Sequence, residues 1–221
     1  VCASLHELGS SIEDIDAILV THEHSDHINR VAQLSKKYHI PVYASELTWE
    51  SLPFYDDYFR WERHIFDYGM EIGDIGLDFF RLSHDAVQPV GLLLEHNGHQ
   101  VGIATDTGMV TPSMYRKLSN VDGLVFEANH DTAMLQHGTY PLFLKQRVAS
   151  DKGHLSNAQA AEALAKLAGP KTKHIILAHL SEKNNMPQLA LQEVSNAFTS
   201  DEGTPNISIA PRRAAHPLIA V

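Results

Sequence analysis

Residues 21–27 read T-H-E-H-S-D-H and place three histidines and two acids within seven positions. The stretch follows a short apolar run that is typical of a buried strand. Because side chains two residues apart in an extended chain point to the same side, His22 and His24 share one face. Asp26 and His27 come after the strand, where a turn can direct them to a second point. Imidazoles and carboxylates at this density favour binding of divalent metals over a polar loop of solvated histidines.

A metal site needs ligands from distant parts of the chain, and three further side chains have the right type and position. Each comes directly after an apolar run that is typical of a strand: His84, Asp106 and His179. Functional side chains are expected at such strand ends, where loops begin. A lone histidine there is more often structural. Three such residues beside the H-x-H-x-D-H stretch instead favour one shared site.

The seven candidate ligands divide into two groups that share one acid. The first group is His22, His24 and His84, and the second is Asp26, His27 and His179. Asp106 suits the position between them, because a carboxylate has two oxygens whereas a neutral imidazole has one free lone pair. Each ion would keep an open position for water or substrate. These ligand types favour two Zn²⁺ ions, with Mn²⁺ or iron as alternatives.

Helical and strand-like patterns alternate along the rest of the chain. Helical spacing or capping signals predict helices at 3–9, 28–38, 46–52, 112–119, 131–136, 141–149, 156–168 and 187–199. Apolar runs predict strands at 16–20, 41–44, 64–68, 77–82, 90–96, 99–105, 122–127, 173–178 and 206–210. The aromatic and acidic segment at 53–63 has no clear period, and packing is favoured there over a substrate-facing loop. This mixture predicts an α/β (α+β) fold with helices on both faces of its sheets.

The order of the candidate ligands resembles that of the metallo-β-lactamase fold superfamily of binuclear metallohydrolases. H-x-H-x-D-H is followed by a single histidine, an aspartate in T-D-T-G and a late histidine. Later stretches are similar to the YycJ/WalJ-type exonuclease branch and to the tRNase Z and RNase J nucleases: E-A-N-H-D at 127–131, G-H-L-S-N at 153–157 and A-H-L-S-E-K-N-N at 178–185. The resemblance covers nearly the whole chain. It implies one domain over residues 1–221, built as a four-layer αββα sandwich of two mixed sheets flanked by helices.

The resemblance also implies a function. It indicates a binuclear-metal-dependent hydrolase, foremost a phosphodiesterase or exonuclease that acts on DNA, or on RNA, through a hydroxide that bridges the metals. His154 would contact the scissile phosphate or assist the leaving oxygen, with a capping or packing histidine as the alternative. Asp26 would also orient the attacking water. The candidates for substrate binding are Asn129, His130, Ser181 and Asn185. An equal alternative is that these residues position the metal ligands.

Two other classes of function remain open from the sequence. The first is another hydrolase of the same fold, such as a β-lactamase, a lactonase or a thioesterase. The second is a non-hydrolytic metal-binding or redox protein. The intact His27 disfavours a redox relative, and a structural zinc site would not need a shared carboxylate.

The net charge limits how the chain could bind nucleic acid. The 221 residues carry a formal net charge of −10, and 43% of them are hydrophobic. The hydrophobic content excludes a disordered chain, and the acidic balance disfavours binding through non-specific phosphate contacts. Nucleic acid as a substrate therefore requires local positive charge at the site, part of which bound cations would supply. The sequence leaves the oligomeric state open.

The cysteine count bears on the compartment of the protein, and the first residues bear on the extent of its first sheet. The single cysteine, Cys2, cannot form a disulfide within the chain, which favours the cytoplasm. No apolar run reaches the roughly 20 residues that span a bilayer, so membrane insertion is not expected. Members of the resembled family open with further strands, including a G-S-S-G-N loop and a strand that ends in D-x-G. We expect the natural protein to carry these strands, because without them the first sheet would have an unpaired edge.

Overall fold

The computed structural model describes residues 1–52, 63–66, 68–198, 203–212 and 214–221. Of the aromatic and acidic segment, residues 53–62 lie outside these ranges. The described strands form two sheets. The smaller sheet is parallel and has the order β1 (Ile18–Leu19), β2 (Val42–Ala44), β3 (Arg63–Ile65). The larger sheet has the order β10 (Asn206–Ile209), β9 (His174–Ala178), β8 (Gly123–Glu127), β7 (His99–Ala104), β6 (Val90–His96), β5 (Ile75–Arg81), β4 (Gly69–Ile72).

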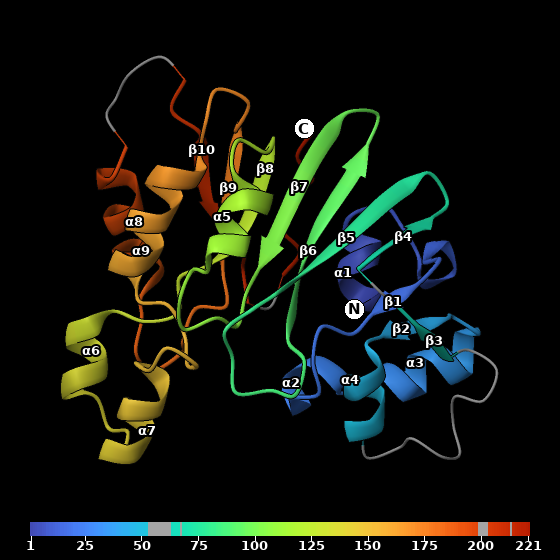
Figure 1. The fold of residues 1–221 in the computed structure, drawn as a ribbon, viewed down its shortest axis with the longest axis horizontal. Helices are drawn as coiled ribbons and strands as arrows, with labels where there is room; N and C mark the ends of the chain where they lie inside the picture. Colours follow the sequence, from blue (N-terminus) through green and yellow to red (C-terminus); the bar gives the residue numbers. More distant parts are fainter. Residues whose placement is uncertain (53–62, 67, 199–202, 213) are drawn as a thin grey trace.

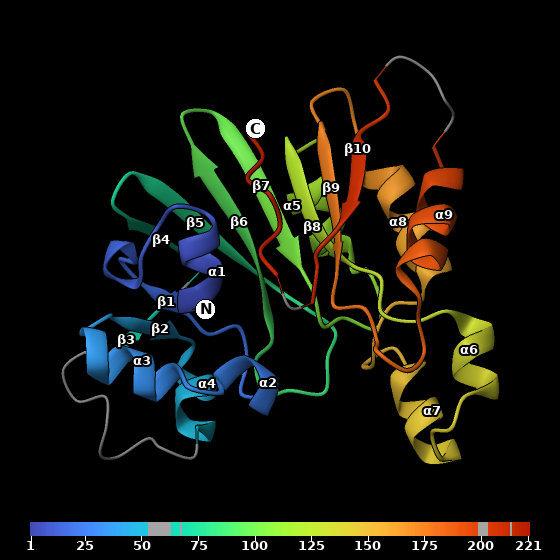
Figure 2. The same cartoon turned by 180° about the vertical axis from the view of Figure 1, so that it is seen from behind.

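The larger sheet is mixed. Strands β7 to β10 run parallel to one another, whereas β4 to β7 pair antiparallel. Parallel strands place their carboxyl ends at one edge of the sheet, so the residues that follow β7, β8 and β9 come together there. In Figures 1 and 2 this edge lies toward the end of the molecule that carries α2, α6 and α7.

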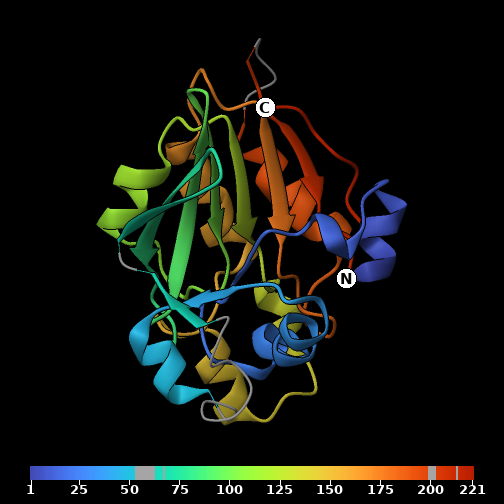
Figure 3. The ribbon, with the colours of Figure 1, turned by 90° about the vertical axis from the view of Figure 1, so that its right-hand side faces the viewer.

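The α-helices of the described residues are α1 (Cys2–Glu7), α2 (Ser25–Ile28), α3 (Val31–Tyr38), α4 (Glu46–Ser51), α5 (Pro112–Leu118), α6 (Thr132–His137), α7 (Leu142–Val148), α8 (Asn157–Leu167) and α9 (Pro187–Asn196). Six of them cover the outer faces of the sheets. Residues of α5, α8 and α9 share one apolar core with the larger sheet, and residues of α2, α3 and α4 share another with the smaller sheet. Figure 3 shows α7 at the same end of the molecule as α3 and α4. Within the described residues, no helix combines the length and the apolar character needed to cross a bilayer.

The two sheets pack against each other through a third apolar cluster. Leu77 and Phe79 of β5 face this cluster, whereas Phe80 faces the core under α5 and α8. This alternation follows from the two-residue period of a strand. Tyr43 of the smaller sheet packs on the same inner cluster. The layers are therefore helix, sheet, sheet and helix, and the predicted mixed α/β fold with two sheets flanked by helices is confirmed.

Most predicted elements lie within a few residues of the observed ones. The short 3₁₀ helix Ile12–Asp14 was not predicted, and two other differences have a physical reason. The predicted helix at 28–38 divides into α2 and α3, because Arg30 takes a left-handed backbone conformation with φ 70°. Strand β4 was not predicted. It contains a glycine and a glutamate, which weaken the strand pattern, and it forms by pairing antiparallel with β5.

Candidate metal centre

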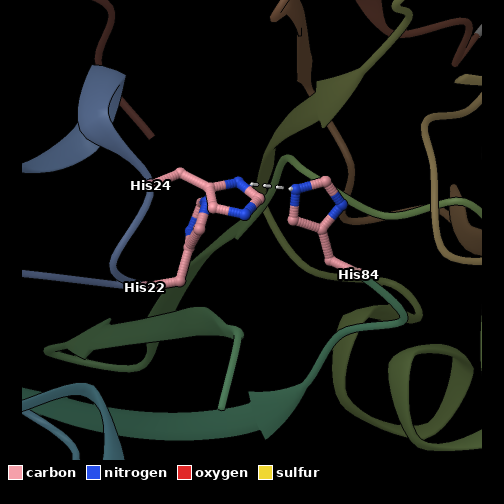
Figure 4. Close-up of side chains that lie close together, drawn as sticks. All are labelled: His22, His24 and His84. Atoms are coloured by element: carbon pink, nitrogen blue, oxygen red, sulfur yellow. Dashed lines mark hydrogen bonds between the residues drawn. The ribbon is translucent and has the colours of Figure 1, made fainter. Parts of the chain in front are cut away.

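Three histidines from two distant segments meet with their rings close together (Figure 4). His22 comes shortly after β1, and His24 is the last residue before α2. His84 follows β5, and its Nε2 lies 3.3 Å from Nδ1 of His24. The ligand atoms of all three rings lie within 4.8 Å of one another. Two nitrogens on one tetrahedral zinc ion are about 3.4 Å apart, since each Zn–N bond is about 2.1 Å. The three rings are thus spaced to hold one ion.

A second group of donors lies beside the first. Asp26 and His27 belong to α2, and His179 follows β9. Asp26 Oδ2 lies 3.8 Å from Nε2 of His27 and 3.9 Å from Nε2 of His179. The ligand atoms of these three residues also lie within 4.8 Å of one another. The short helix α2 therefore separates the donors of the H-x-H-x-D-H stretch into two groups.

Asp106 lies between the two groups. Its Oδ2 is 3.2 Å from Nε2 of His27, and its Oδ1 is 3.4 Å from Nε2 of His179 and 3.9 Å from Nε2 of His84. Asp106 and His179 both take left-handed backbone conformations, with φ of 63° and 57°. Non-glycine residues adopt this conformation rarely, and such strain gathers at functional sites. The carboxylate of Asp106 faces donors from both groups.

The chemistry of this cluster fits divalent cations. His22 Nε2 is buried and has no hydrogen-bond partner among the described residues. An unsatisfied buried polar group costs about 1–3 kcal/mol. A cation placed among the donors would satisfy this atom, and imidazole and carboxylate ligands suit first-row divalent metals.

Hydrogen bonds to the other ring nitrogens fix the orientation of these histidines. Thr21 Oγ1 lies 3.1 Å from Nδ1 of His22 and 3.4 Å from Nδ1 of His27. His84 Nδ1 donates to the carbonyl of Gly153 at 3.1 Å. Each contact occupies Nδ1 and leaves Nε2 for a metal, which is how outer contacts orient metal-binding histidines.

Glu127, the last residue of β8, is fully buried behind the centre. Its Oε1 accepts hydrogen bonds from Nδ1 of His154 and Nδ1 of His179, each at 2.8 Å. Its Oε2 accepts from the backbone N–H groups of Thr107 and Leu155. Burial raises the pKa of a carboxyl, but the donors of His154 and His179 outweigh it and hold the pKa of Glu127 below its usual value. Glu127 is therefore an anion that aligns both histidines.

His154 lies where two pockets meet. A pocket of about 210 Å³ contains candidate ligands from both groups, and a larger one of about 800 Å³ extends past the end of β9. His154 and His179 line both pockets. The ring centroid of His154 lies 5.0 Å from that of His84 and 5.1 Å from that of His179. His154 thus borders the metal cluster while its Nδ1 is held by Glu127.

Comparison with known proteins agrees with this geometry. The family described as Beta-lactamase superfamily domain matches residues 3–180. The exodeoxyribonuclease WalJ of Streptococcus pneumoniae serotype 2 (strain D39) is 41% identical over 201 residues, which cover 89% of this chain and 75% of that protein. The exodeoxyribonuclease YycJ of Bacillus anthracis is 43% identical over 191 residues, which cover 85% of this chain and 72% of that protein. The chain belongs to the metallo-β-lactamase fold superfamily, in its WalJ/YycJ-like branch.

A solved structure of this superfamily has the same fold. The metallo-β-lactamase fold protein YhfI from Bacillus subtilis superposes with a TM-score of 0.68, at 20% sequence identity, over 90% of this chain and 76% of that chain. In this metallo-β-lactamase fold, the structure brings together all seven side chains that the sequence singled out as metal ligands. Their individual roles as ligands stay a prediction.

The sequence reasoning missed Glu127, Thr21 and Asp85, whose carboxylate lies 3.5 Å from Nε2 of His84. Glu127 ends an apolar strand, which is the same signal that singled out Asp106 and His179, but no role was assigned to it. Thr21 gives no such signal, because its contact with two rings depends on the turn that forms α2.

Three of the four predicted substrate-binding residues line the larger pocket, and the fourth does not. Asn129, Ser181 and Asn185 line the 800 Å³ pocket. The Asn129 side chain donates to the carbonyl of His179 at 2.8 Å, and Asn185 donates to the carbonyl of Ala128 at 2.9 Å. These contacts hold the loop that carries His179. His130 is 3% exposed and is not among the described residues that line this pocket.

We predict that Glu127→Gln lowers both metal affinity and turnover by about 10- to 100-fold, the range found for partners of metal-binding histidines. An amide nitrogen cannot accept a hydrogen bond, so one pair of buried donors would lose its acceptor. Metal content after dialysis and turnover at saturating metal measure the two effects. Glu162→Gln on the exposed face of α8 is the matched control. Wild-type metal content and turnover in Glu127→Gln would contradict the positioning role.

Two of the candidate ligands, His22 and His179, have pKa values shifted in opposite directions. Burial and the neighbouring His27 lower the pKa of His22 to about 3. Burial also opposes a charge on His179, but the carboxylates of Asp26 and Glu127 outweigh it and raise its pKa to about 10. At neutral pH and without metal, His22 is therefore neutral and His179 carries a proton.

Metal binding at His179 should release that proton, because a coordinating imidazole must be neutral. We expect the affinity for the ion held by His179 to rise about tenfold per pH unit between pH 6 and 8. The rise should end once pH exceeds the folded-state pKa of about 10. Competition with a chromophoric chelator measures this slope, and His137→Gln, an exposed histidine on α6, should leave it unchanged. A metal affinity independent of pH in this range would contradict the protonated state of His179.

Proposed function

We propose that this chain is a metal-dependent exonuclease that hydrolyses phosphodiester bonds of DNA at a centre of two divalent cations, with Zn²⁺ as the preferred metal. The observation that carries the proposal is the carboxylate of Asp106 between two groups of three donors, with His154 beside them. The names of the relatives at 41% and 43% identity support DNA as the substrate.

Charge at the centre explains how an acidic protein can attract a phosphodiester. Two divalent cations, when bound, would neutralise developing oxygen charge and lower the pKa of a water molecule. Asp26 and Asp106 are the anionic donors of the seven and would offset two of the four positive charges. Glu127 and Asp85, which contact donor histidines, would offset the other two, and Arg147 beside Asp85 adds one positive charge. The centre would therefore keep a local positive charge within a chain whose formal net charge is −10.

His154 is the residue that we assign to proton transfer. Its Nδ1 is hydrogen-bonded to Glu127, so Nε2 is the atom left to face a substrate. A proton on Nε2 can pass to the oxygen that leaves phosphorus, and the contact with Glu127 holds the ring in place for this transfer. Asp26 is 65% exposed at its side chain and can accept a hydrogen bond from a water aligned for attack.

The 800 Å³ pocket is the space that we assign to the nucleotide next to the scissile bond. It begins at His154 and His179 and includes Arg212 in its wall. Arg212 donates through Nη2 to the carbonyl of Leu180 at 2.5 Å and pairs with Glu182 at 3.3 Å. These contacts hold a guanidinium near the centre, where it can bind phosphate.

A substrate panel with metal-reconstituted protein tests the proposed function. The substrates are labelled single- and double-stranded DNA, RNA, bis-p-nitrophenyl phosphate, nitrocefin and a lactone, each assayed with Zn²⁺ and with Mn²⁺. We expect turnover of DNA and of bis-p-nitrophenyl phosphate, with loss of both in excess chelator and recovery when metal is returned. Nitrocefin or lactone turnover without phosphodiester turnover would overturn the proposal.

A further inference from the structure

Helix α7 presents apolar side chains to solvent beside the metal centre. Leu142 is 70% exposed and Phe143 is 71% exposed. Leu144 and Val148 of the same helix line the 210 Å³ pocket. In Figures 1 and 2, α7 stands with α6 away from the layers of the sandwich, at the end of the molecule that carries α2. The helix is thus placed to contact a substrate that enters the metal centre.

Arg147 of the same helix is fixed at the mouth of the centre. Its Nε donates to Asp85 Oδ2 at 2.6 Å. The other oxygen of Asp85 lies 3.6 Å from Nε2 of His24 and 3.5 Å from Nε2 of His84. Asp85 therefore ties the guanidinium to the first group of candidate ligands. Arg147 remains 59% exposed and lines the 210 Å³ pocket, so its terminal nitrogens are accessible.

The charge of this part of the chain is opposite to that of the whole. Residues 132–154 contain Lys145, Arg147 and Lys152 against the single acid Asp151, and one net positive charge remains when Asp85, the partner of Arg147, is included. The chain as a whole has a formal net charge of −10. A local basic surface on an acidic protein directs anions to itself. The anion that a nuclease centre takes is the phosphate backbone of its substrate.

Phe143 and Arg147 are four residues apart and lie on the same side of the helix, one turn from each other. An exposed aromatic ring beside a cation is the arrangement that binds single-stranded nucleic acid, because the ring stacks on a base and the cation binds the backbone. We propose that α7 holds the single-stranded end of the DNA substrate, with Phe143 stacked on a base and Arg147 bound to a neighbouring phosphate. This inference rests on the proposed nuclease function.

Binding of a phosphorothioate-blocked oligothymidylate to the metal-loaded protein tests the inference without cleavage. Phe143→Ser should weaken binding about tenfold, within the range for loss of one base-stacking contact. An abasic strand of the same length should bind wild type and Phe143→Ser equally. Arg147→Gln should weaken binding of both strands and reduce the slope of log affinity against log salt by about 0.7, the value for one phosphate contact with a single strand.

Matched controls separate this surface from general effects. Tyr68→Ser removes another ring that is 75% exposed, and Lys166→Ala removes a cation that is 57% exposed and paired with Glu162. Neither should change DNA affinity. Thermal unfolding and metal content of each variant report on folding, and Arg147→Lys offers a second variant that keeps the positive charge near Asp85.

The outcomes distinguish this inference from the proposed function. If wild type cleaves neither DNA nor bis-p-nitrophenyl phosphate, the proposed function fails. If wild type cleaves DNA but Phe143→Ser binds the base-bearing strand as wild type does, the inference about α7 is overturned and the nuclease function stands. Unchanged DNA binding together with self-association that Phe143→Ser abolishes would instead make α7 a protein contact.

Discussion

Replacement of Asp106 by alanine is expected to remove both bound metal and activity. Asp106 is 2% exposed. Its carboxylate faces His27 through one oxygen and His84 and His179 through the other. Without it, two cations would lose their shared anion and repel each other at close range. A two-metal clamp supplies several kcal/mol of transition-state stabilisation, so turnover should fall by at least about 10³-fold.

Metal content by mass spectrometry under native conditions and turnover of bis-p-nitrophenyl phosphate measure this effect. Asp106→Asn keeps the shape of the side chain without its charge and should also lose metal. Asp122→Asn is the matched control for this substitution. Asp122 also faces a histidine, His99, but it lies just before β8 and outside the metal centre. If Asp106→Ala retains two equivalents of metal and wild-type turnover, Asp106 is not the shared ligand.

Replacement of His154 by alanine is expected to retain the metal and lower DNA turnover by about 10²- to 10⁴-fold, the usual contribution of general acid–base catalysis. His154 borders the cluster but holds its Nδ1 against Glu127. The seven candidate ligands are left intact, so metal content should match wild type.

The leaving group distinguishes proton donation from a packing role. Thymidine 5′-p-nitrophenyl phosphate and a thymidine dinucleotide present the same nucleotide but have different leaving groups. p-Nitrophenolate can leave without a proton, whereas a sugar oxygen needs a proton in order to leave. His154→Ala should therefore lose far more activity on the dinucleotide than on the p-nitrophenyl ester. An equal loss on both substrates would count against proton donation, and an unchanged rate on the dinucleotide would reject any catalytic role.

The fold was predictable from the sequence to a large extent because its strands and helices have strong local patterns. The apolar runs of β5 to β9 and the capped helix α8 were placed within a few residues of their observed bounds. The break at Arg30 was not predictable, because a left-handed backbone is rare at a residue other than glycine and arginine has no preference for it. The extent of the domain stays a prediction.

The sequence by itself determined which donors the chain offers and where the strands that carry them end. Imidazoles and carboxylates just past apolar runs are local features, and they suffice to predict a metal centre and its family. Only the tertiary structure decided that Glu127, paired in register with Ala178, reaches both His154 and His179, and that Asp85 ties Arg147 to the centre. The reason is physical: these contacts join residues 27 to 62 positions apart, and their distances depend on strand register and loop closure, which no local pattern encodes.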